Sequence, residues 1–523
     1  MAFRKRGYGL DRLDFGGNGE AGGEVTPAAV SGDQLFPLSP AQLGIWYAQH
    51  LDPQVPITIA QYVDLDGDVD VEVLSRASLD ASHELGSGFV RIVERDGEPL
   101  QYVDHTLGDT DGVEHIDLRD AADPEAAAHE WMRADYGRPL NIITDRLVRS
   151  AALQLSDDRW FWYSRAHHIV LDGFGAVNQV NRIAERYTAY RNGVEPAALK
   201  ASDLRDLVES EFAYRDSTRF ESDKQYWAER VAGLEEGTSL TGRNAAPAPL
   251  NDVVGAALSD DRNDLLAEAV RRHDSSPAAL LIAGFAAYLA QWTDAEDVIL
   301  SLPVTARTTA VMRRSGGATS NIVPLRLRVG HDTTVTDLLK SVQVEVSGAL
   351  RHQRYRHEDI RRDSAAAGRE SGSGDGVVTK EFFGPWVNIM LFQDELVLGS
   401  TPGRLHVLST GSIEDLGVNF YQTEGGARSR IDFETNPNLY TEDEARHHHS
   451  RFLEFFDRFL QADAQERLWG LPITTAVERA YVVPNGQVHV AGEAHRGAVP
   501  FRQRRIRPIA LDDDTRPDVP AFR

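Results

Sequence analysis

The stretch RWFWYSRAHHIVLDGFGAVNQVNRIAERY, residues 159–187, constrains the fold more than any other part of the chain. Its first third is almost entirely bulky and aromatic, which is typical of a central β-strand covered on both faces. The part after Gly173 has the spacing of an amphipathic helix, with apolar residues at Val177, Val180, Ala184 and Tyr187. A buried strand followed directly by such a helix predicts a layered fold of sheets and helices.

The rest of the chain mixes strand and helix patterns without a strict strand–helix–strand rhythm, which predicts a mixed α/β or α+β fold. Hairpins are expected at 89–103, with Asp96-Gly97 at the tip, and at 147–169, turning at Asp157-Asp158. Further strands are expected at 57–67, 297–304, 321–329, 382–392 and 428–436. Helices are expected at 71–85, 174–192, about 203–232, 277–292 and 441–461.

Composition excludes several classes of function. A net charge of −25 argues against a nucleic-acid or anionic-membrane partner. Cysteine is absent, which removes thiol nucleophiles and Cys-based zinc sites and agrees with a cytoplasmic location. No secretory signal or stretch of membrane-spanning length is expected. The Gly-rich residues 1–33 predict a disordered leader, 484–523 a disordered tail, and 364–376 a mobile loop.

The segment HHIVLDG lies where the aromatic strand gives way to the helix. Neighbouring residues on a strand point to opposite faces, so His167 and His168 are poorly placed to bind one metal ion together, and no metal site is predicted. The run HHH at 447–449 lies on a polar helix pattern and supplies no clear partner ligands. Asp172 and Gly173 fall at a helix N-terminus, where unpaired amides favour negative charge. These residues fit an acyl-transfer site, and they fit equally well a buried histidine beside a helix-capping aspartate.

The same segment resembles the H-H-x-x-x-D-G motif of the condensation domains of nonribosomal peptide synthetases, in the chloramphenicol acetyltransferase superfamily. Other segments are similar to that family, namely LSPAQLGIWYAQHLDP, VILSLPVTAR, SNIVPLRL, FGPWVNIMLF and GSIEDLGVNFY. The last two resemble segments of the subfamily that includes siderophore synthetases. The resemblance extends over about residues 34–480.

The resemblance implies two chloramphenicol-acetyltransferase-like lobes in a V-shaped pseudo-dimer, with a central tunnel for two phosphopantetheine arms. We expect an N-terminal lobe at 34–205 and a C-terminal lobe at 206–483. The implied activity is amide-bond formation between a carrier-bound donor acyl thioester and the amine of a carrier-bound aminoacyl acceptor, in siderophore-like or other secondary-metabolite biosynthesis. The expected partners are donor and acceptor carrier proteins and other synthetase modules. The protein itself is expected to be a monomer with no bound cofactor or metal.

The resemblance also assigns residues. His168 matches the catalytic histidine, and the amide of Gly173 is a candidate for polarising the donor carbonyl. His167, Asp172 and Arg307 are expected to have structural roles at the active site, with Asp172 and Arg307 forming an ion pair. Trp46, Asn321 and Arg326 are candidates for tunnel or interface positions, and each is equally compatible with a core role. Acceptor contacts are expected from NIMLF and STGSIEDL.

The chain departs from the family at the second motif, where SHELGSGF keeps His83 and Glu84 but has serine in place of the first arginine. This altered motif keeps a catalytically silent recruitment domain open. An ester-forming enzyme also stays open, because the sequence does not separate a hydroxyl from an amine nucleophile, whereas an epimerisation domain is disfavoured by GFGAVNQV. The segment RHQRYRHEDIRR, 351–362, is either a docking patch for acidic carriers or a solvated helix face. Arg351, Arg354 and Arg362 are its candidate contacts.

Overall fold

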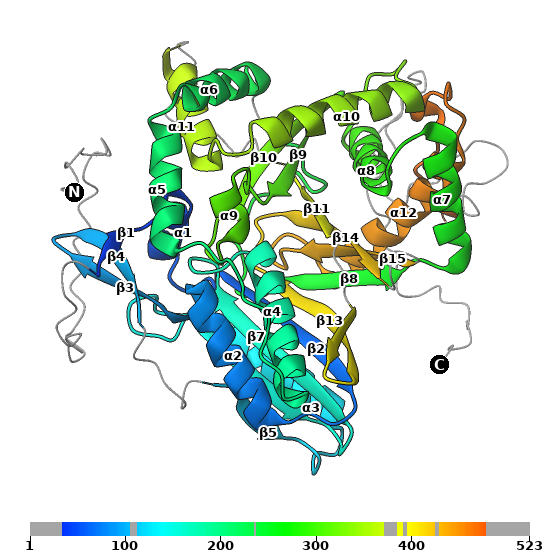
Figure 1. Cartoon of the computed structure of the whole chain (residues 1–523). Helices are drawn as coiled ribbons and strands as arrows, with labels where there is room; N and C mark the ends of the chain where they lie inside the picture. The colour runs from blue at the N-terminus through cyan, green and yellow to red at the C-terminus, as the bar shows by residue number, and fades with distance from the viewer. Residues whose placement is uncertain are drawn as a thin grey trace.

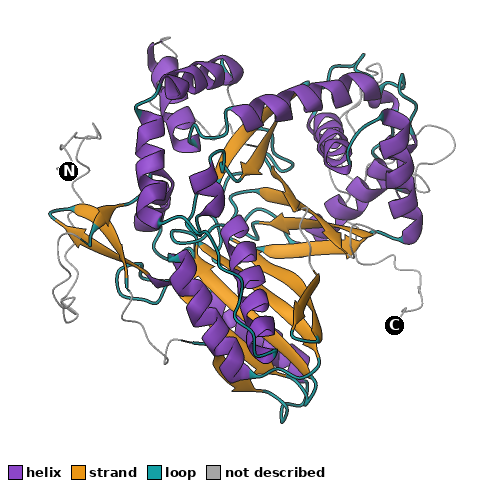
Figure 2. Ribbon diagram, in the orientation of Figure 1, coloured by secondary structure: helices purple, strands orange, loops and turns teal. Residues whose placement is uncertain are grey.

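The computed structural model describes residues 34–104, 112–234, 237–370, 384–390, 395–423, 428–476 and 478. The predicted leader and tail lie outside these residues. The described chain forms two large mixed sheets, each six-stranded, and one small three-stranded sheet (Figures 1 and 2).

The first large sheet has the strand order β12-β13-β2-β7-β6-β5. Its strands are β2 (Thr58–Asp66), β5 (Glu114–Asp117), β6 (Val148–Gln154), β7 (Arg159–His167), β12 (Glu395–Leu398) and β13 (Thr401–Thr410). The aromatic strand β7 is central, because β2 and β6 pair with it on either side. Its odd-numbered aromatic residues Phe161 and Tyr163 pack in one apolar cluster, and the even-numbered Trp160 and Trp162 pack in another on the opposite face.

Helices cover both faces of this sheet. α2 (Val71–Leu85) and α4 (Gly173–Arg191) lie side by side on one face, and α3 (Pro124–Tyr136) lies on the other (Figure 1). The predicted stripe of α4 packs inward, since Val180, Ala184 and Tyr187 are buried against the sheet and α2. The hairpin of β3 (Val90–Arg95) and β4 (Glu98–Val103) joins β1 (Phe36–Pro37) in the small sheet, turning at Asp96-Gly97 as predicted.

The second large sheet has the order β10-β9-β11-β14-β15-β8. Its strands are β8 (Asp252–Ala257), β9 (Asp297–Val304), β10 (Asn321–Arg328), β11 (Trp386–Met390), β14 (Leu416–Thr423) and β15 (Arg428–Thr435). The helices α7 (Asp260–His273), α8 (Pro277–Thr293), α10 (Val335–Arg351) and α12 (Glu442–Gln461) cover its outer face. The remaining helices are α1 (Pro40–Leu51), α5 (Leu204–Arg215), α6 (Thr218–Val231), α9 (Ala310–Arg314) and α11 (His357–Glu370).

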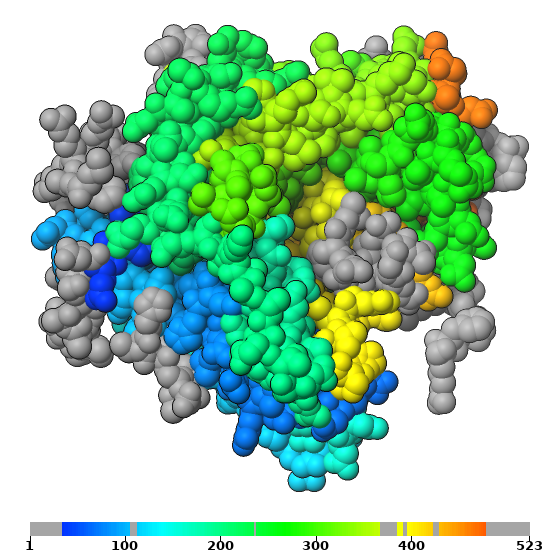
Figure 3. Space-filling model, in the orientation of Figure 1, coloured from blue at the N-terminus to red at the C-terminus, as the bar shows by residue number. Residues whose placement is uncertain are grey.

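The second half of the chain also contributes to the first sheet. β13 pairs antiparallel with β2 from Gly403↔Leu65 to Thr410↔Ile59, and β12 continues the sheet beyond it. The yellow segment that holds β12 and β13 accordingly lies against the blue and green first half on the molecular surface (Figure 3). This exchange brings residues 409–412 next to the end of β7.

Two local expectations are wrong. The helical pattern at about 203–232 forms two helices, because Ser217 caps α6 by accepting a hydrogen bond from the amide of Phe220. The predicted loop at 364–376 begins as helix, since α11 continues to Glu370, and residues 371–376 lie outside the described part of the chain. Alanines at 365–367 have high helix propensity, which outweighs the lack of larger apolar residues.

Candidate active site

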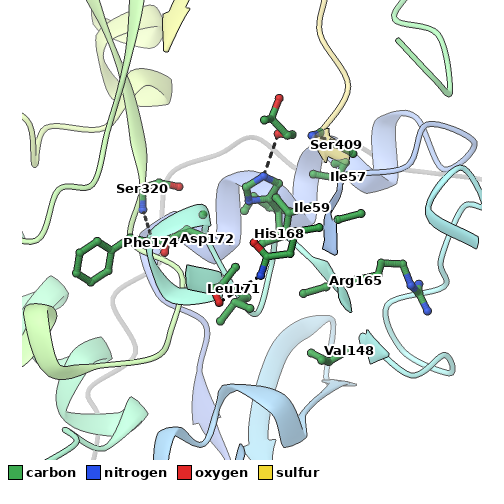
Figure 4. Close-up of a pocket in the computed structure, with 18 of the residues that line it drawn as sticks. Ile57, Ile59, Val148, Arg165, His168, Leu171, Asp172, Phe174, Ser320 and Ser409 are labelled. Atoms are coloured by element: carbon green, nitrogen blue, oxygen red, sulfur yellow. Dashed lines mark hydrogen bonds between the residues drawn. The ribbon is translucent and has the colours of Figure 1, made fainter. Parts of the chain in front are cut away.

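A cavity of about 1340 Å³ lies between the two large sheets. Its walls come from α1, β2, β7 and α4 on one side and from β9, β10, α11 and β11 on the other, with the end of β13 between them. His168, Asp172 and Gly173 all line it. In Figure 4 the His168 side chain lies near the centre, between Ile59 and the Ser409 end of β13.

His167 is fully buried and points away from this cavity. Its Nδ1 accepts a hydrogen bond from the amide of Ile169 at 3.1 Å, so the ring proton lies on Nε2, which donates to Gln49 Oε1 at 3.0 Å. Burial, together with the nearby His168 and Arg165, lowers the pKa of His167 to about 3. A permanently neutral His167 therefore fixes the backbone at the end of β7.

His168 points into the cavity. Its Nε2 lies 3.2 Å from the carbonyl oxygen of Thr410, at the end of β13. Burial lowers the pKa of the ring, although the Thr410 carbonyl and the Asp172 carboxylate oppose that shift. The ring is consequently neutral near pH 7, which is the form that can accept a proton.

Asp172 joins the two halves of the molecule. Its carboxylate caps α4 by accepting a hydrogen bond from the amide of Gly175 at 2.8 Å. Both carboxylate oxygens also accept hydrogen bonds from Arg307 Nη2, at 2.8 and 3.0 Å. The amides of Thr319 and Ser320 also donate to it, at 2.8 and 3.0 Å. Burial alone raises the pKa of this carboxyl, but Arg307 and these amide donors lower it overall.

Arg307 is equally buried. Besides Asp172, its guanidinium donates to the carbonyls of Met312, Ser315 and Gly317 at 2.6–2.8 Å. It also lies 4.7 Å from the centre of the Phe174 ring. The ion pair implied by the family resemblance is thus present, and it pins the first turn of α4 to the segment before β10.

Gly173 begins α4 and is exposed to the cavity. A Cβ built at this position would meet no atom within 4 Å, so the space over the helix terminus is open. The first amides of a helix have no partner within it, and the macrodipole favours negative charge there. This end of α4 therefore can receive a carbonyl oxygen on which charge develops.

The other predicted residues lie in three different environments. Trp46, on α1, is buried in the apolar core of the first half and does not line the cavity. Asn321 lines the cavity, but its side chain binds the backbone of Gln353, Tyr355 and His357. Arg326 lies on β10, away from the cavity, and forms a bidentate ion pair with Asp297.

The His168 contact depends on residues that the sequence did not single out. The side chain of Glu434, on β15, accepts three hydrogen bonds. The donors are Thr410 Oγ1 at 3.0 Å, Asn419 Nδ2 at 2.9 Å and Asn251 Nδ2 at 2.7 Å. The same Asn251 amide donates to the carbonyl of Gly411 at 2.8 Å. Burial raises the pKa of Glu434, because these neutral donors only partly oppose it. We call Glu434 and its three partners the Glu434 anchor. It holds the end of β13 in contact with His168.

A second anchor holds α4 to α2. Glu84, in the altered second motif, binds Arg182 at 2.6 and 2.8 Å and also contacts Arg186. Burial alone raises its pKa, but these two guanidiniums lower it to about 2. The family motif thus keeps a structural use in this chain even though its first arginine is replaced.

The histidine run and the basic segment have other contacts. His447, His448 and His449 bind Asp443 O, Tyr288 and Ile431 O, respectively. Within the described ranges, no group of three or more His, Asp or Glu residues is arranged to hold a metal ion. Arg354 is committed to Glu211 and to the face of Tyr214, and Arg362 pairs with Asp359. None of the helices in the described part is long and apolar enough to cross a membrane.

The condensation domain family model matches residues 33–470. The chain belongs to this family. Curated relatives include a dimodular nonribosomal peptide synthase of Bacillus subtilis (strain 168), 33% identical over 426 residues. This match covers 81% of the chain and 17% of the relative. An isonitrile lipopeptide synthase of Streptomyces coeruleorubidus is 35% identical over 410 residues, 78% of the chain and 27% of the relative.

Siderophore synthetases are among the relatives of this condensation domain. Enterobactin synthase component F of Escherichia coli O157:H7 is 30% identical over 437 residues, covering 82% of the chain and 32% of the relative. The chain therefore spans about a sixth to a third of the length of these proteins. Condensation domains act with carrier domains that present substrates on phosphopantetheine arms.

Solved condensation domains have the same mixed α/β fold. The starter condensation domain of rhizomide synthetase, solved in complex with C8-CoA, is 32% identical with a TM-score of 0.76, covering 84% of this chain and 98% of that one. The first condensation domain of the calcium-dependent antibiotic synthetase is 31% identical with a TM-score of 0.75, covering 84% and 99%.

Proposed function

We propose that this condensation domain joins a carrier-bound donor acyl thioester to the amine of a carrier-bound aminoacyl acceptor, forming an amide. One observation carries the proposal. His168 and the open N-terminus of α4 line one cavity between the two sheets. The Asp172–Arg307 ion pair holds the helix end, and the Thr410 carbonyl contacts His168. The cavity thus offers a nitrogen base and an oxyanion-binding end at the same place.

In this proposal His168 receives the acceptor amine. A carbonyl oxygen can only accept, so the neutral ring presents Nε2–H to Thr410 O in the substrate-free arrangement. When the acceptor amine enters, it donates one N–H to the Thr410 carbonyl. The His168 ring then carries its proton on Nδ1, so that Nε2 accepts the second N–H of the amine. Because the pKa of the ring is lowered, His168 positions the amine and accepts its proton only as the tetrahedral intermediate forms.

The amide of Gly173 serves the donor. A thioester carbonyl placed over the first turn of α4 gains negative charge when the amine attacks, and the helix terminus stabilises that charge. The donor thiol then leaves. The Asp172–Arg307 ion pair fixes the direction of α4, so His167, Asp172 and Arg307 act as positioning residues.

The wider assignments are part of the same proposal. We assign the two large sheets to chloramphenicol-acetyltransferase-like lobes in a V with a tunnel through the cavity. The chain passes from the first lobe to the second near residue 205, and β12 and β13 then return to complete the first sheet. The two phosphopantetheine arms enter from opposite faces, delivered by donor and acceptor carriers to a monomeric, cytoplasmic enzyme without metal or bound cofactor. Siderophore-like or other secondary-metabolite biosynthesis is the proposed setting, because enterobactin synthase is among the relatives.

A single-turnover transfer assay tests the proposal. One carrier protein is loaded with a panel of acyl donors and another with a panel of amino acids, and intact-protein mass spectrometry follows the mass of the acceptor carrier. We expect a mass gain with the wild type, and a loss of about 10²–10⁴-fold in rate with His168→Ala. His447→Ala is the control, because His447 lies on α12 away from the cavity and should leave the rate unchanged.

Two other outcomes would point to different functions. A mass gain only with hydroxy-acid acceptors would assign an ester-forming enzyme. Carrier binding without transfer to any acceptor would contradict catalysis and favour a recruitment domain.

A further inference from the structure

The cavity continues from His168 into the first half of the molecule. This inner chamber lies between α2 and α4 on one side and the sheet face of β2, β7 and β6 on the other. Its walls are largely apolar and include Ile59, Val148, Trp162, Val180 and Ile183. In Figure 4 Ile59 lies beside His168, and Val148 lies further from it, beyond Leu171. An apolar space reached past the reaction centre suits the body of a donor acyl group.

The chamber is not uniformly apolar. Gln61, Ser164 and Ser150 are cross-strand neighbours on β2, β7 and β6, and all three line the cavity. Gln61 and Ser150 have their own partners, because Gln61 donates to Ala176 O and Ser150 accepts the indole N–H of Trp162 at 3.0 Å. They make this band of the floor polar and uncharged.

Two polar atoms on the helices opposite have no partner among the described residues. Ser78 on α2 and Gln179 on α4 are each 7% exposed, and Ser78 Oγ and Gln179 Oε1 make no hydrogen bond. The two residues belong to one patch, since Gln179 Nε2 donates to Ser82 Oγ at 3.0 Å, one helical turn along from Ser78. Leaving a buried polar group unpaired is costly, so this patch is adapted to a polar group that enters the chamber.

The chemistry of the two atoms defines that group. Gln179 Oε1 only accepts, whereas the Ser78 hydroxyl has a hydrogen to donate. An alcohol or phenol hydroxyl answers both, because it donates one hydrogen bond and accepts another. A carboxylate cannot donate to Gln179, and a methyl group forms neither hydrogen bond. An ammonium can donate to both oxygens, but it leaves the hydrogen of the Ser78 hydroxyl without an acceptor.

Charge in the chamber agrees with an uncharged ligand. Arg149 and Arg165 also line the cavity, but Arg149 pairs with Glu114 and Asp135, and Arg165 pairs with Asp135 on α3, the helix on the opposite face of the sheet. Glu114 and Asp135 thus balance the charges of the two arginines, although Arg165 Nη1 has no hydrogen-bond partner among the described residues.

The length of the donor follows from α4. Gln179 is six residues beyond Gly173, which places it about 9 Å further along the helix axis. An extended zigzag chain advances about 1.25 Å per carbon–carbon bond of about 1.5 Å, so about eight carbons span that distance. A hydroxyl near the end of such a chain reaches the patch while the thioester carbonyl lies at Gly173.

We propose that the inner chamber selects a donor acyl group that carries an alcohol or phenol hydroxyl about 9 Å from its thioester carbonyl, and that Ser78 and Gln179 bind this hydroxyl. The inference rests on the proposed function, because it assigns the donor of the same reaction. It makes Ser78 and Gln179 specificity-determining residues, with no part in the chemical step.

A competition assay tests this inference. Equal amounts of octanoyl and 8-hydroxyoctanoyl donors on the same carrier compete for one acceptor, and mass spectrometry measures the product ratio. We expect the wild type to favour the hydroxylated donor about ten-fold, since two new hydrogen bonds form. Ser78→Ala should reduce the preference to about three-fold without lowering the melting temperature, because the serine hydroxyl has no partner to lose. Octanedioyl, which is anionic at its far end, should be the poorest donor.

The control is Ser87→Ala. Ser87 Oγ is also buried and unpartnered but does not line the chamber, so this variant should keep the full preference. Equal use of the two donors by the wild type, or an unchanged preference in Ser78→Ala, would overturn the inference while leaving condensation established. Transfer of short acyl groups only would also overturn it. Absence of transfer with every donor would instead contradict the proposed function itself.

Discussion

Two buried carboxylates hold the candidate site from opposite sides, and their surroundings differ. Asp172 meets a guanidinium and several amides, and its pKa is lowered. Glu434 meets only amide and hydroxyl donors, and its pKa is raised. The first side, which fixes the helix terminus, relies on charge. The second side, which fixes the contact of His168, relies on neutral hydrogen bonds, and the two sides should therefore respond differently to mutation and pH.

The largest effect is expected from breaking the charged side. Arg307→Met leaves Asp172 buried without its cation and should cost about 3–5 kcal/mol of unfolding free energy, measured by urea denaturation. Arg326→Met is the matched control, because it removes a similar bidentate pair that is about one-third exposed, and it should cost at most about 1 kcal/mol. Equal losses in the two variants would contradict the special role of the buried pair.

Removing the neutral side should be milder for stability and specific for activity. Glu434→Ala deprives Thr410, Asn419 and Asn251 of their acceptor, which should cost about 1–3 kcal/mol and lower kcat more than KM as the Thr410 carbonyl shifts. Asp415→Asn alters a half-buried carboxyl of the same half, one bound to Tyr440 outside the cavity. That variant should leave kcat unchanged. An equal fall in kcat in Asp415→Asn would contradict a specific role of the Glu434 anchor in catalysis.

The two carboxylates should also have opposite pH signatures. The lowered pKa of Asp172 means that its stabilisation is fully present above its ordinary value of 3.8 and is lost only as pH falls through the folded value. The raised pKa of Glu434 means that wild-type stability declines as pH rises from 4.5 to the folded value. Melting temperatures across pH should therefore show a constant deficit for Asp172→Asn above pH 4, and a relative gain for Glu434→Gln as pH rises. Parallel curves for the two variants would refute the distinction.

A smaller effect is expected at the helix terminus that Asp172 holds. Gly173→Ala adds a methyl group where a Cβ meets no protein atom, so folding should be unaffected while donor transfer slows about ten-fold by misplacement of the carbonyl. Gly470→Ala adds the same group to another open position, outside the cavity, and should not change the rate. A normal rate in Gly173→Ala would argue against a donor carbonyl over α4.

The smallest expected effect is on how the single-turnover rate falls at acidic pH. Since burial lowers the pKa of His168, the limb due to this ring should lie below pH 6.5, whereas the limb due to the acceptor amine should follow that amine, with a pKa near 8 for an α-amine. Single-turnover rates with acceptors of different amine pKa separate the two. A His168 limb above pH 6.5 would contradict the environment described here.

The sequence predicted the parts of the site that are local. A strand end, a capping aspartate and a helix start follow one another within seven residues, so periodicity and capping rules locate His168, Asp172 and Gly173. Family resemblance added Arg307. Thr410 lies within STGSIEDL, which the family resemblance indicated for acceptor contacts and not for a contact with His168. Glu434 was missed, because it comes from a distant strand and carries no local pattern. The exchange of β12 and β13 into the first sheet was equally invisible, since an edge pairing over such a separation leaves no periodic trace.

That strand exchange also has a consequence for synthesis. β2 acquires its neighbour β13 only after the ribosome has added roughly 340 more residues, which takes on the order of half a minute at about 5–20 residues per second. During that time the nascent first half presents an unpaired, largely buried-type strand edge, which is a template for aggregation. A fragment that ends before residue 395 would keep this edge permanently, so chaperone dependence should be highest for truncated and slowly translated forms of the chain.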